Sequence, residues 1–332
     1  MALGTKGPVP VVIDEFGHVL DADRAVDSTI AAAFGPAGRR STASQARLIL
    51  CGSAISVMRA LTAGEAPLRG RAGMELIMYA DDYRAATAHL ADPTDLHAAV
   101  QVYAVIGGVV GYATDMVNFD LPDGVGDVDR WIVQRILSPG ATMRNEATTL
   151  LAEDPIRDQR PLYALDDPFL QFHYAVVDAN GSMLRDRAPE DVWKNRLRAS
   201  FDSQVRGPVF EAQARTWARR FASNATIEPD SRIGTSSVTV DGVELQIDLV
   251  AAGDGPVPAK RAIIALGEAQ AGEPLGLGHV SRLERARTAL GQRAADAKLF
   301  LFGTEFDPAL ATAASKRHDV EIVDLDRLYH GD

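Results

Sequence analysis

Short apolar runs that end in polar residues constrain the fold of this chain more than any other feature. Near the start, one run covers residues 9–16 and a second covers residues 47–53, with a helical pattern at 22–34 between them. Such runs are typical of parallel strands that are buried on both faces, with functional residues at their carboxyl ends. The start of the chain is therefore predicted to form a parallel sheet with a crossover helix.

The alternation of strand and helix patterns continues to the end of the chain. A third N-terminal strand is expected at 74–78, and mostly helical patterns cover 83–137 and 190–221. Further along, we expect strands at 238–240, 243–251, 261–267, 298–302 and 320–324, with helices at 279–296 and 307–316. Strands that alternate with crossover helices indicate an α/β fold.

The chain is long enough for two ordinary domain cores, since 46% of its 332 residues are hydrophobic. We expect a partial parallel-sheet core at 1–82, a helical subdomain at 83–150 and a second α/β domain at 169–330. The stretch at 151–168 is charged and contains proline, which is typical of a junction between folding units.

Composition limits the partners and the location that we expect. The net charge of −11 argues against a broad nucleic-acid surface, because phosphate binding needs a positive footprint. The longest apolar run, Val102 to Ala113, has twelve residues and is too short to span a membrane. With a single cysteine, Cys51, and no signal-peptide pattern, the chain is expected to be cytoplasmic.

Asp14 and Glu15 end the first apolar run, and this pattern matches the Walker B strand of many ATPases. There the aspartate anchors Mg²⁺ and the glutamate polarises the attacking water. The usual partner is the loop Gly-x-x-x-x-Gly-Lys-Ser/Thr, whose backbone amides cradle the phosphates. No Gly-Lys-Ser/Thr occurs in the 332 residues. Asp-Glu after an apolar strand is also common by chance, so the motif alone leaves both interpretations open.

Three acidic residues of the second half fall where a metal-dependent phosphodiesterase needs them. Glu211 lies in a long helical pattern, Asp248 lies in a strand pattern and Glu268 ends the apolar run Ile263 to Gly267. A charge that closes an apolar strand is costly unless it is solvated, paired or bound to a metal. Mg²⁺ held by Asp248 and Glu268 would offset that cost and generate a nucleophilic hydroxide. The alternative is that these are ordinary acids at a sheet edge.

The spacing of these acids resembles the PD-(D/E)XK nuclease superfamily, which places Glu on a helix, Asp on a strand and Glu-x-Lys on the next strand. Gln270 stands at the lysine position here. Glutamine can hydrogen-bond a water or a phosphate, but it supplies no positive charge to the transition state.

A helical pattern follows this strand and contains Arg282, Arg285 and Arg287. These arginines would either face a phosphate backbone or form a solvated helix face with Glu284 as a partner. The second interpretation is favoured on the pattern.

Several short segments stand in an order that is more specific than any one of them. They are 11–16 (VVIDEF), 48–53 (LILCGS), 66–71 (APLRGR), 167–172 (DPFLQF), 207–211 (GPVFE) and 267–270 (GEAQ). In this combination the chain resembles the archaeal and actinobacterial AAA+-related ATPases that end in a nuclease-like domain of unknown function. The resemblance extends over most of residues 9–290. It implies a partial P-loop ATPase sheet with a helical subdomain, followed by a restriction-endonuclease-like α/β domain.

The resemblance also implies roles at an ATP site. Asp14 would hold Mg²⁺, Glu15 would orient the attacking water and Ser53 would sense the γ-phosphate. Arg71 would contact phosphate or hold the sensor loop, or it would simply pair with an acid at 81–82. ATP and Mg²⁺ are the cofactors that such a site implies.

The chain departs from the family pattern at three places. It lacks the phosphate loop, it has too few residues at 151–165 for the family's winged helix, and Gln270 replaces the lysine. We therefore expect an ATP-binding AAA+-like family member with a nuclease-like domain that does not hydrolyse ATP alone. A second hypothesis is a decayed or non-catalytic interaction module, and a third is a Mg²⁺-dependent nuclease that uses Glu211, Asp248 and Glu268. The partner would be a nucleic acid or a protein.

Overall fold

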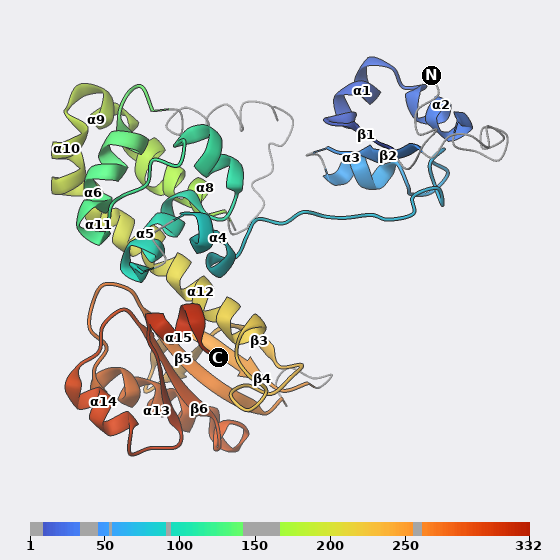
Figure 1. Ribbon diagram of the computed structural model, residues 1–332. Helices are drawn as coiled ribbons and strands as arrows, with labels where there is room; N and C mark the ends of the chain where they lie inside the picture. The colour runs from blue at the N-terminus through green and yellow to red at the C-terminus, as the bar shows by residue number, and fades with distance from the viewer. Residues whose placement is uncertain (1–8, 34–45, 53–54, 91–93, 142–166, 255–260) are drawn as a thin grey trace. The chain divides into compact units, whose positions relative to one another are not determined.

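The computed structural model describes residues 9–33, 46–52, 55–90, 94–141, 167–254 and 261–332 (Figure 1). The chain divides into two compact units, Met1–Tyr79 and Ala80–Asp332. The division lies three residues before the boundary that the sequence predicts at 82. Both units combine helices with strands, so the predicted α/β class is confirmed at this level.

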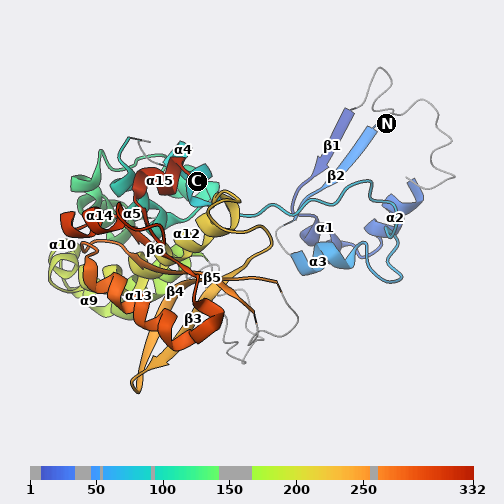
Figure 2. The same cartoon turned by 90° about the horizontal axis from the view of Figure 1, so that it is seen from below.

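Unit 1 is built on two parallel strands, β1 (Val9–Ile13) and β2 (Ala46–Leu50), which lie side by side in Figure 2. Its helices are α1 (Phe16–Ala22), α2 (Val26–Ala33) and α3 (Ile55–Ala60). Phe16 is fully buried and forms a small core with Ala31, Leu61 and Leu68. The predicted pair of parallel strands near the start of the chain is confirmed. Their predicted burial on both faces is wrong, since Val12 and Ile49 are 57% and 46% exposed.

The strand predicted at 74–78 is wrong. These residues carry no strand, and Met74, Leu76, Met78 and Tyr79 expose between 69% and 80% of their surface. A strand exists only through hydrogen bonds to a neighbour, and an apolar sequence alone cannot supply one. Among the described residues of unit 1, β1 and β2 pair only with each other.

The first part of unit 2 is helical. Among its helices are α4 (Tyr83–Leu90), α5 (Leu96–Ile106), α8 (Pro168–Phe172), α9 (Gly181–Asp186) and α12 (Gly207–Arg220). Further helical segments of the described residues are η2 (Tyr112–Met116), η3 (Val125–Asp127), α6 (Val128–Trp131), η4 (Ile132–Leu137), η5 (His173–Val177), η6 (Asp178–Asn180), α10 (Pro189–Val192), η7 (Trp193–Leu197), α11 (Arg198–Phe201) and η8 (Asp202–Arg206). The long helix predicted at 190–221 is confirmed, since the last of these segments and α12 form an unbroken helical run from Pro189 to Arg220.

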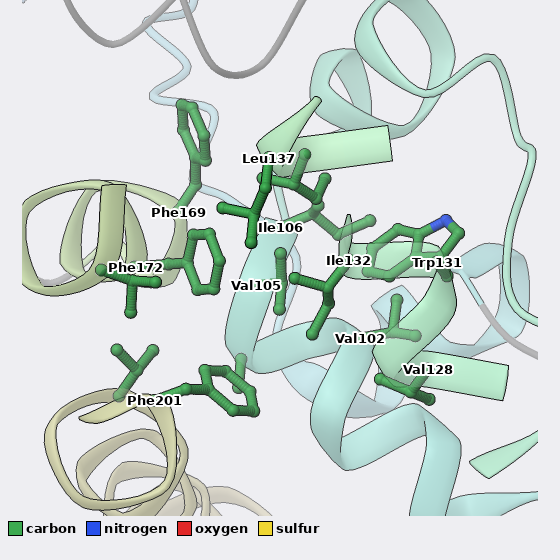
Figure 3. Packing of buried hydrophobic residues seen from close by; sticks show 14 of the residues in the cluster. Val102, Val105, Ile106, Val128, Trp131, Ile132, Leu137, Phe169, Phe172 and Phe201 are labelled. Atoms are coloured by element: carbon green, nitrogen blue, oxygen red, sulfur yellow. The ribbon is translucent and has the colours of Figure 1, made fainter. Parts of the chain in front are cut away.

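The helical core forms around α5. Val102, Val105 and Ile106 of this helix are fully buried, and the aromatic side chains of Phe172 and Phe201 lie in the same cluster (Figure 3). Five large side chains removed from water stabilise this core by about 1.5–3 kcal/mol each. The packing joins α5 to segments that follow it by 65 residues or more.

Asp167, Pro168 and Phe169 each have a structural role at the start of α8. The Asp167 Oδ1 atom accepts a hydrogen bond of 3.2 Å from the Leu170 amide, so it caps the helix. Pro168 stands at the first helical position, where its missing N–H costs nothing. Phe169 then points into the helical core with 1% of its surface exposed.

The second part of unit 2 is a five-stranded mixed sheet. Its strands are β3 (Arg232–Val240), β4 (Val243–Ala252), β5 (Ile263–Gln270), β6 (Lys298–Gly303) and β7 (Val320–Val323), in the order β3-β4-β5-β6-β7. The first three strands are antiparallel, whereas β5, β6 and β7 are parallel. The strands predicted in this region are confirmed, and the turn Asp241-Gly242 between β3 and β4 has positive φ at both residues, as tight hairpins prefer.

Helices cover both faces of this sheet. On one face, Trp217 of α12 packs against Phe300 and Phe302 of β6. On the other, Leu283 of α13 (Leu277–Leu290) packs in a cluster with Leu299 and Leu301. The remaining elements are η10 (Gly291–Ala294), α14 (Pro308–Ala314) and α15 (Leu325–His330). No helix of the described residues is long and apolar enough to cross a bilayer.

Candidate carboxylate site on the sheet

Asp248 and Glu268 come from neighbouring antiparallel strands. Leu249 pairs with Gly267 in the register of β4 and β5, so the residues just outside this pair lie at the same level of the sheet. The Ala269 amide donates a hydrogen bond of 3.0 Å to Asp248 Oδ2. Asp248 exposes 8% of its surface and Glu268 exposes 5%, so both carboxylates are buried.

Glu211 approaches the two strand carboxylates from α12. Its Oε2 atom lies 3.7 Å from Arg215 Nη1 on the next turn of the helix. The same arginine nitrogen donates a hydrogen bond of 3.0 Å to the backbone oxygen of Asp248. Arg215 therefore ties the helix to β4 beside Asp248, and the three acids that the sequence predicts to converge are brought together.

Burial raises the pKa values of all three acids. Burial and, next, the charge of Asp248 together raise the pKa of Glu211 to about 7, against the nearby Arg215. Burial also raises the pKa of Glu268 to about 7, again with a contribution from Asp248. The pKa of Asp248 rises by burial, although the amide of Ala269 opposes the rise. Near neutral pH, this cluster therefore holds protons that exposed carboxylates would have lost.

Arg282 of α13 provides the cation nearest to Glu268. Its Nη1 atom lies 2.7 Å from Glu268 Oε1, and its Nη2 atom donates to the Gln246 backbone oxygen at 2.9 Å. The favoured prediction, a solvated face with Glu284 as partner, is wrong for Arg282, because Glu284 pairs with Arg317 at 2.6 Å. Residues two positions apart on a helix do not face each other, whereas the packing of α13 on the sheet brings Glu268 within reach.

Two buried polar atoms of this arrangement, Glu268 Oε2 and Arg282 Nε, find no hydrogen-bond partner among the residues that the structure describes. Gln270 is half-buried and ends β5, two residues after Glu268 and hence on the same face of the strand. Its uncharged amide stands where the resemblance implies a lysine.

The arrangement does not fit a bound Mg²⁺ as it stands. Across the described ranges, no group of three or more His, Cys, Asp and Glu side chains is placed to hold a metal ion. Metal ligation by Asp248 and Glu268 would compete directly with the Ala269 amide and the Arg282 guanidinium for the same oxygens. Protein donors therefore already engage one oxygen of each carboxylate, Asp248 Oδ2 and Glu268 Oε1, which a metal would have to share or displace.

The residues implied at an ATP site lie in unit 1. Asp14 follows β1 and is exposed, and its Oδ1 atom accepts a hydrogen bond of 2.9 Å from the Glu15 amide. Glu15 precedes α1 in the left-handed conformation, with φ of 46°. Two backbone hydrogen bonds of Cys51 hold the turn between β1 and α1. Its amide donates to the Ile13 carbonyl oxygen, and its carbonyl oxygen accepts from the Phe16 amide. Both acids thus lie at the carboxyl end of a parallel strand, as the apolar run predicts.

Ser53 and Arg71, the other two residues implied at an ATP site, add little support for one. Ser53 lies outside the described residues. Arg71 is exposed, and its Nε atom donates to the Pro67 backbone oxygen at 2.9 Å, so it holds its own turn. Asp82, one of the acids considered as a partner for Arg71, pairs with Arg220 at 2.6 Å.

Comparisons with protein-family models, with curated proteins and with solved structures give no match to this chain.

Proposed function

We propose that the C-terminal part of unit 2 is a nuclease-like domain of PD-(D/E)XK type that does not cleave its ligand. The order of elements supports the type: α12, three antiparallel strands, α13 and a parallel strand β6. The positions of Glu211 on the helix and of Asp248 and Glu268 on the second and third strands support it as well. The chain would then act as a non-catalytic interaction module.

The proposal that this domain does not cleave its ligand rests on one ion pair. Arg282 Nη1 lies 2.7 Å from Glu268 Oε1, so a fixed guanidinium already neutralises the acid that would bind a metal. Gln270 adds no second cation on the same face. Hydrolysis of a phosphodiester needs positive charge that stabilises the negative charge of the transition state. Here the guanidinium of Arg282 is already paired with Glu268 before any substrate binds.

For unit 1 we propose descent from an AAA+-like ATP-binding core without ATP hydrolysis by this chain alone. Asp14 and Glu15 at the end of β1 support the descent. The 332 residues contain no phosphate loop, and the backbone amides of that loop provide most of the binding energy for the phosphates. Incubation of the purified chain with labelled ATP and Mg²⁺ should give no turnover, whereas turnover lost on Asp14→Asn would refute the proposal.

A second candidate is a Mg²⁺-dependent nuclease that uses Glu211, Asp248 and Glu268. Its support is the convergence of three acids, two of which have pKa values raised to about 7. A divalent cation bound between these acids would relieve their mutual repulsion.

A cleavage assay separates the two candidates. The intact chain is incubated with single- and double-stranded DNA and RNA in Mg²⁺ or Mn²⁺, beside Asp248→Asn and Arg219→Gln variants. Arg219 is an exposed residue of α12 and serves as the matched control. The non-catalytic module predicts no cleavage by any of the three proteins. Cleavage by the wild type and the control, abolished in Asp248→Asn, would establish the nuclease instead.

A further inference from the structure

A polar pocket of about 220 Å³ opens where the parallel strands β5 and β6 end. It is lined by Gly272, which follows β5, and by Thr304 and Glu305, which follow β6. Two arginines, Arg198 of α11 and Arg206 of η8, also line it. Ligands of α/β proteins commonly bind at the carboxyl ends of parallel strands, because the loops there diverge and leave a crevice.

Arg206 is the unusual residue of this pocket. Its side chain exposes only 13% of its surface, and among the described residues no group accepts a hydrogen bond from its buried Nε atom. Burial lowers the pKa of the guanidinium, although the nearby Asp202 opposes this shift. A buried cation is costly unless polar or anionic partners surround it, so an anion in the pocket would lower this cost.

The loop after β5 is shaped around that guanidinium. Gly272 has φ of +100°, and a Cβ atom at this position would overlap the Arg206 side chain. The Gly272 amide donates a hydrogen bond of 3.1 Å to Thr304 Oγ1. Since the hydroxyl oxygen accepts that bond, its own hydrogen remains available to a ligand in the pocket.

Asp202 sets the two arginines side by side. Its Oδ2 atom lies 3.2 Å from Arg198 Nε and its Oδ1 atom lies 3.2 Å from Arg206 Nη2. Arg198 is held further by an ion pair with Asp129 and by a hydrogen bond of 3.3 Å from Nη2 to Gln101 Oε1. Both guanidinium groups are therefore oriented before any ligand arrives, which reduces the entropy lost on binding.

We propose that this pocket binds a single phosphate group. Two oriented guanidinium groups and a hydroxyl donor match the oxygens of a phosphate, which arginine binds through paired hydrogen bonds. The carboxylates Asp202 and Glu305 balance the charge of the arginines and disfavour a long polyanion. The volume likewise suits one phosphate group with a few waters or a small mononucleotide. This site does not depend on whether the carboxylate cluster cleaves anything.

The test is calorimetric titration of the intact chain with inorganic phosphate, thymidine 5′-monophosphate and thymidine, at constant ionic strength. Both phosphate compounds should bind and thymidine should not. Arg206→Gln should weaken binding by about tenfold or more, because it removes a charge-assisted hydrogen bond. Arg219→Gln, which removes an exposed arginine of α12, should bind like the wild type.

The two ligands distinguish the sources of the phosphate. Tighter binding of the nucleotide assigns the pocket to a nucleic-acid or nucleotide phosphate, and equal binding assigns it to a free phosphate. If Arg206→Gln does not fold, Thr304→Ala provides the second variant, since it removes one donor and leaves both arginines. No binding of inorganic phosphate in the millimolar range, or equal binding by the wild type and the pocket variants, would overturn the proposal.

Discussion

Arg282 Nη1 lies 2.7 Å from Glu268 Oε1, so a helix on one face of the sheet pairs with a buried acid of its central strand, β5. The two residues are 14 positions apart and belong to different elements, α13 and β5. Because the Glu268 side chain is 6% exposed, we expect this ion pair to affect both the stability of the sheet and the chemistry of the carboxylates.

Removal of the arginine should therefore destabilise unit 2. Arg282→Gln leaves the buried carboxylate of Glu268 without its cation, and we expect the free energy of unfolding to fall by about 1–3 kcal/mol. This is less than for a fully buried pair because the arginine is partly solvated. Urea unfolding at pH 8 measures the loss. The double variant Arg282→Gln/Glu268→Gln should recover most of it, and a double variant no more stable than the single one would contradict the assignment.

Stability should also depend on pH through Glu211. Its folded pKa of about 7 lies above the ordinary value of 4.5, so the folded state binds the proton more tightly than the unfolded state. The resulting stabilisation is fully present below pH 4.5 and is lost as pH rises through about 7. Glu211→Gln should thus be more stabilising at pH 8 than at pH 5 by about 1–3 kcal/mol. Urea unfolding of both proteins at the two pH values checks this, and a pH-independent difference would refute it.

The helical core around α5 should tolerate little loss of volume. Phe172 is fully buried beside Phe201, with ring centroids 5.8 Å apart. Phe172→Ala should lower the free energy of unfolding by about 3–5 kcal/mol, since it removes both transfer energy and packing. Val243→Ala is the control, because Val243 is 61% exposed, and it should change stability by less than about 0.5 kcal/mol. Thermal or urea unfolding distinguishes the two.

Limited proteolysis should cut first at the exposed apolar segment 74–79. Leu76 and Met78 are 69% and 80% exposed and carry no strand or helix, so thermolysin can bind the backbone there in extended form. Mass spectrometry should detect a resistant fragment that begins near Ala80. The variant Leu76→Asp/Met78→Asp removes preferred sites and should slow this cut. Initial cleavage inside 207–332 would contradict the division into two units.

Local patterns were enough to predict much of the sheet. The apolar runs at 263–267 and 298–302 end at polar residues or glycine, and each lies within a buried parallel strand. Asp14 likewise follows β1 at its carboxyl end. For β5 and β6 the information is contained in a few consecutive residues, because burial on both faces demands an unbroken apolar run.

The segment 74–78 shows where such patterns fail. It has the composition of a strand, yet it has no partner among the described residues of unit 1. Backbone pairing is a relation between two segments, and the sequence of one segment cannot show whether the other is present. By contrast, the helix predicted at 190–221 is confirmed, because helical segments follow one another without a break from Pro189 to Arg220.

The sequence by itself determined the α/β class, most strands of the sheet and the identity of the three acids Glu211, Asp248 and Glu268. Only the tertiary structure decided what those acids face. Arg215 and Arg282 reach them because α12 and α13 pack on opposite faces of the sheet, and Arg206 enters its pocket because the loop at Gly272 leaves room. Burial, pairing and charge compensation depend on distances between elements remote in sequence, and those distances are fixed only when the chain packs.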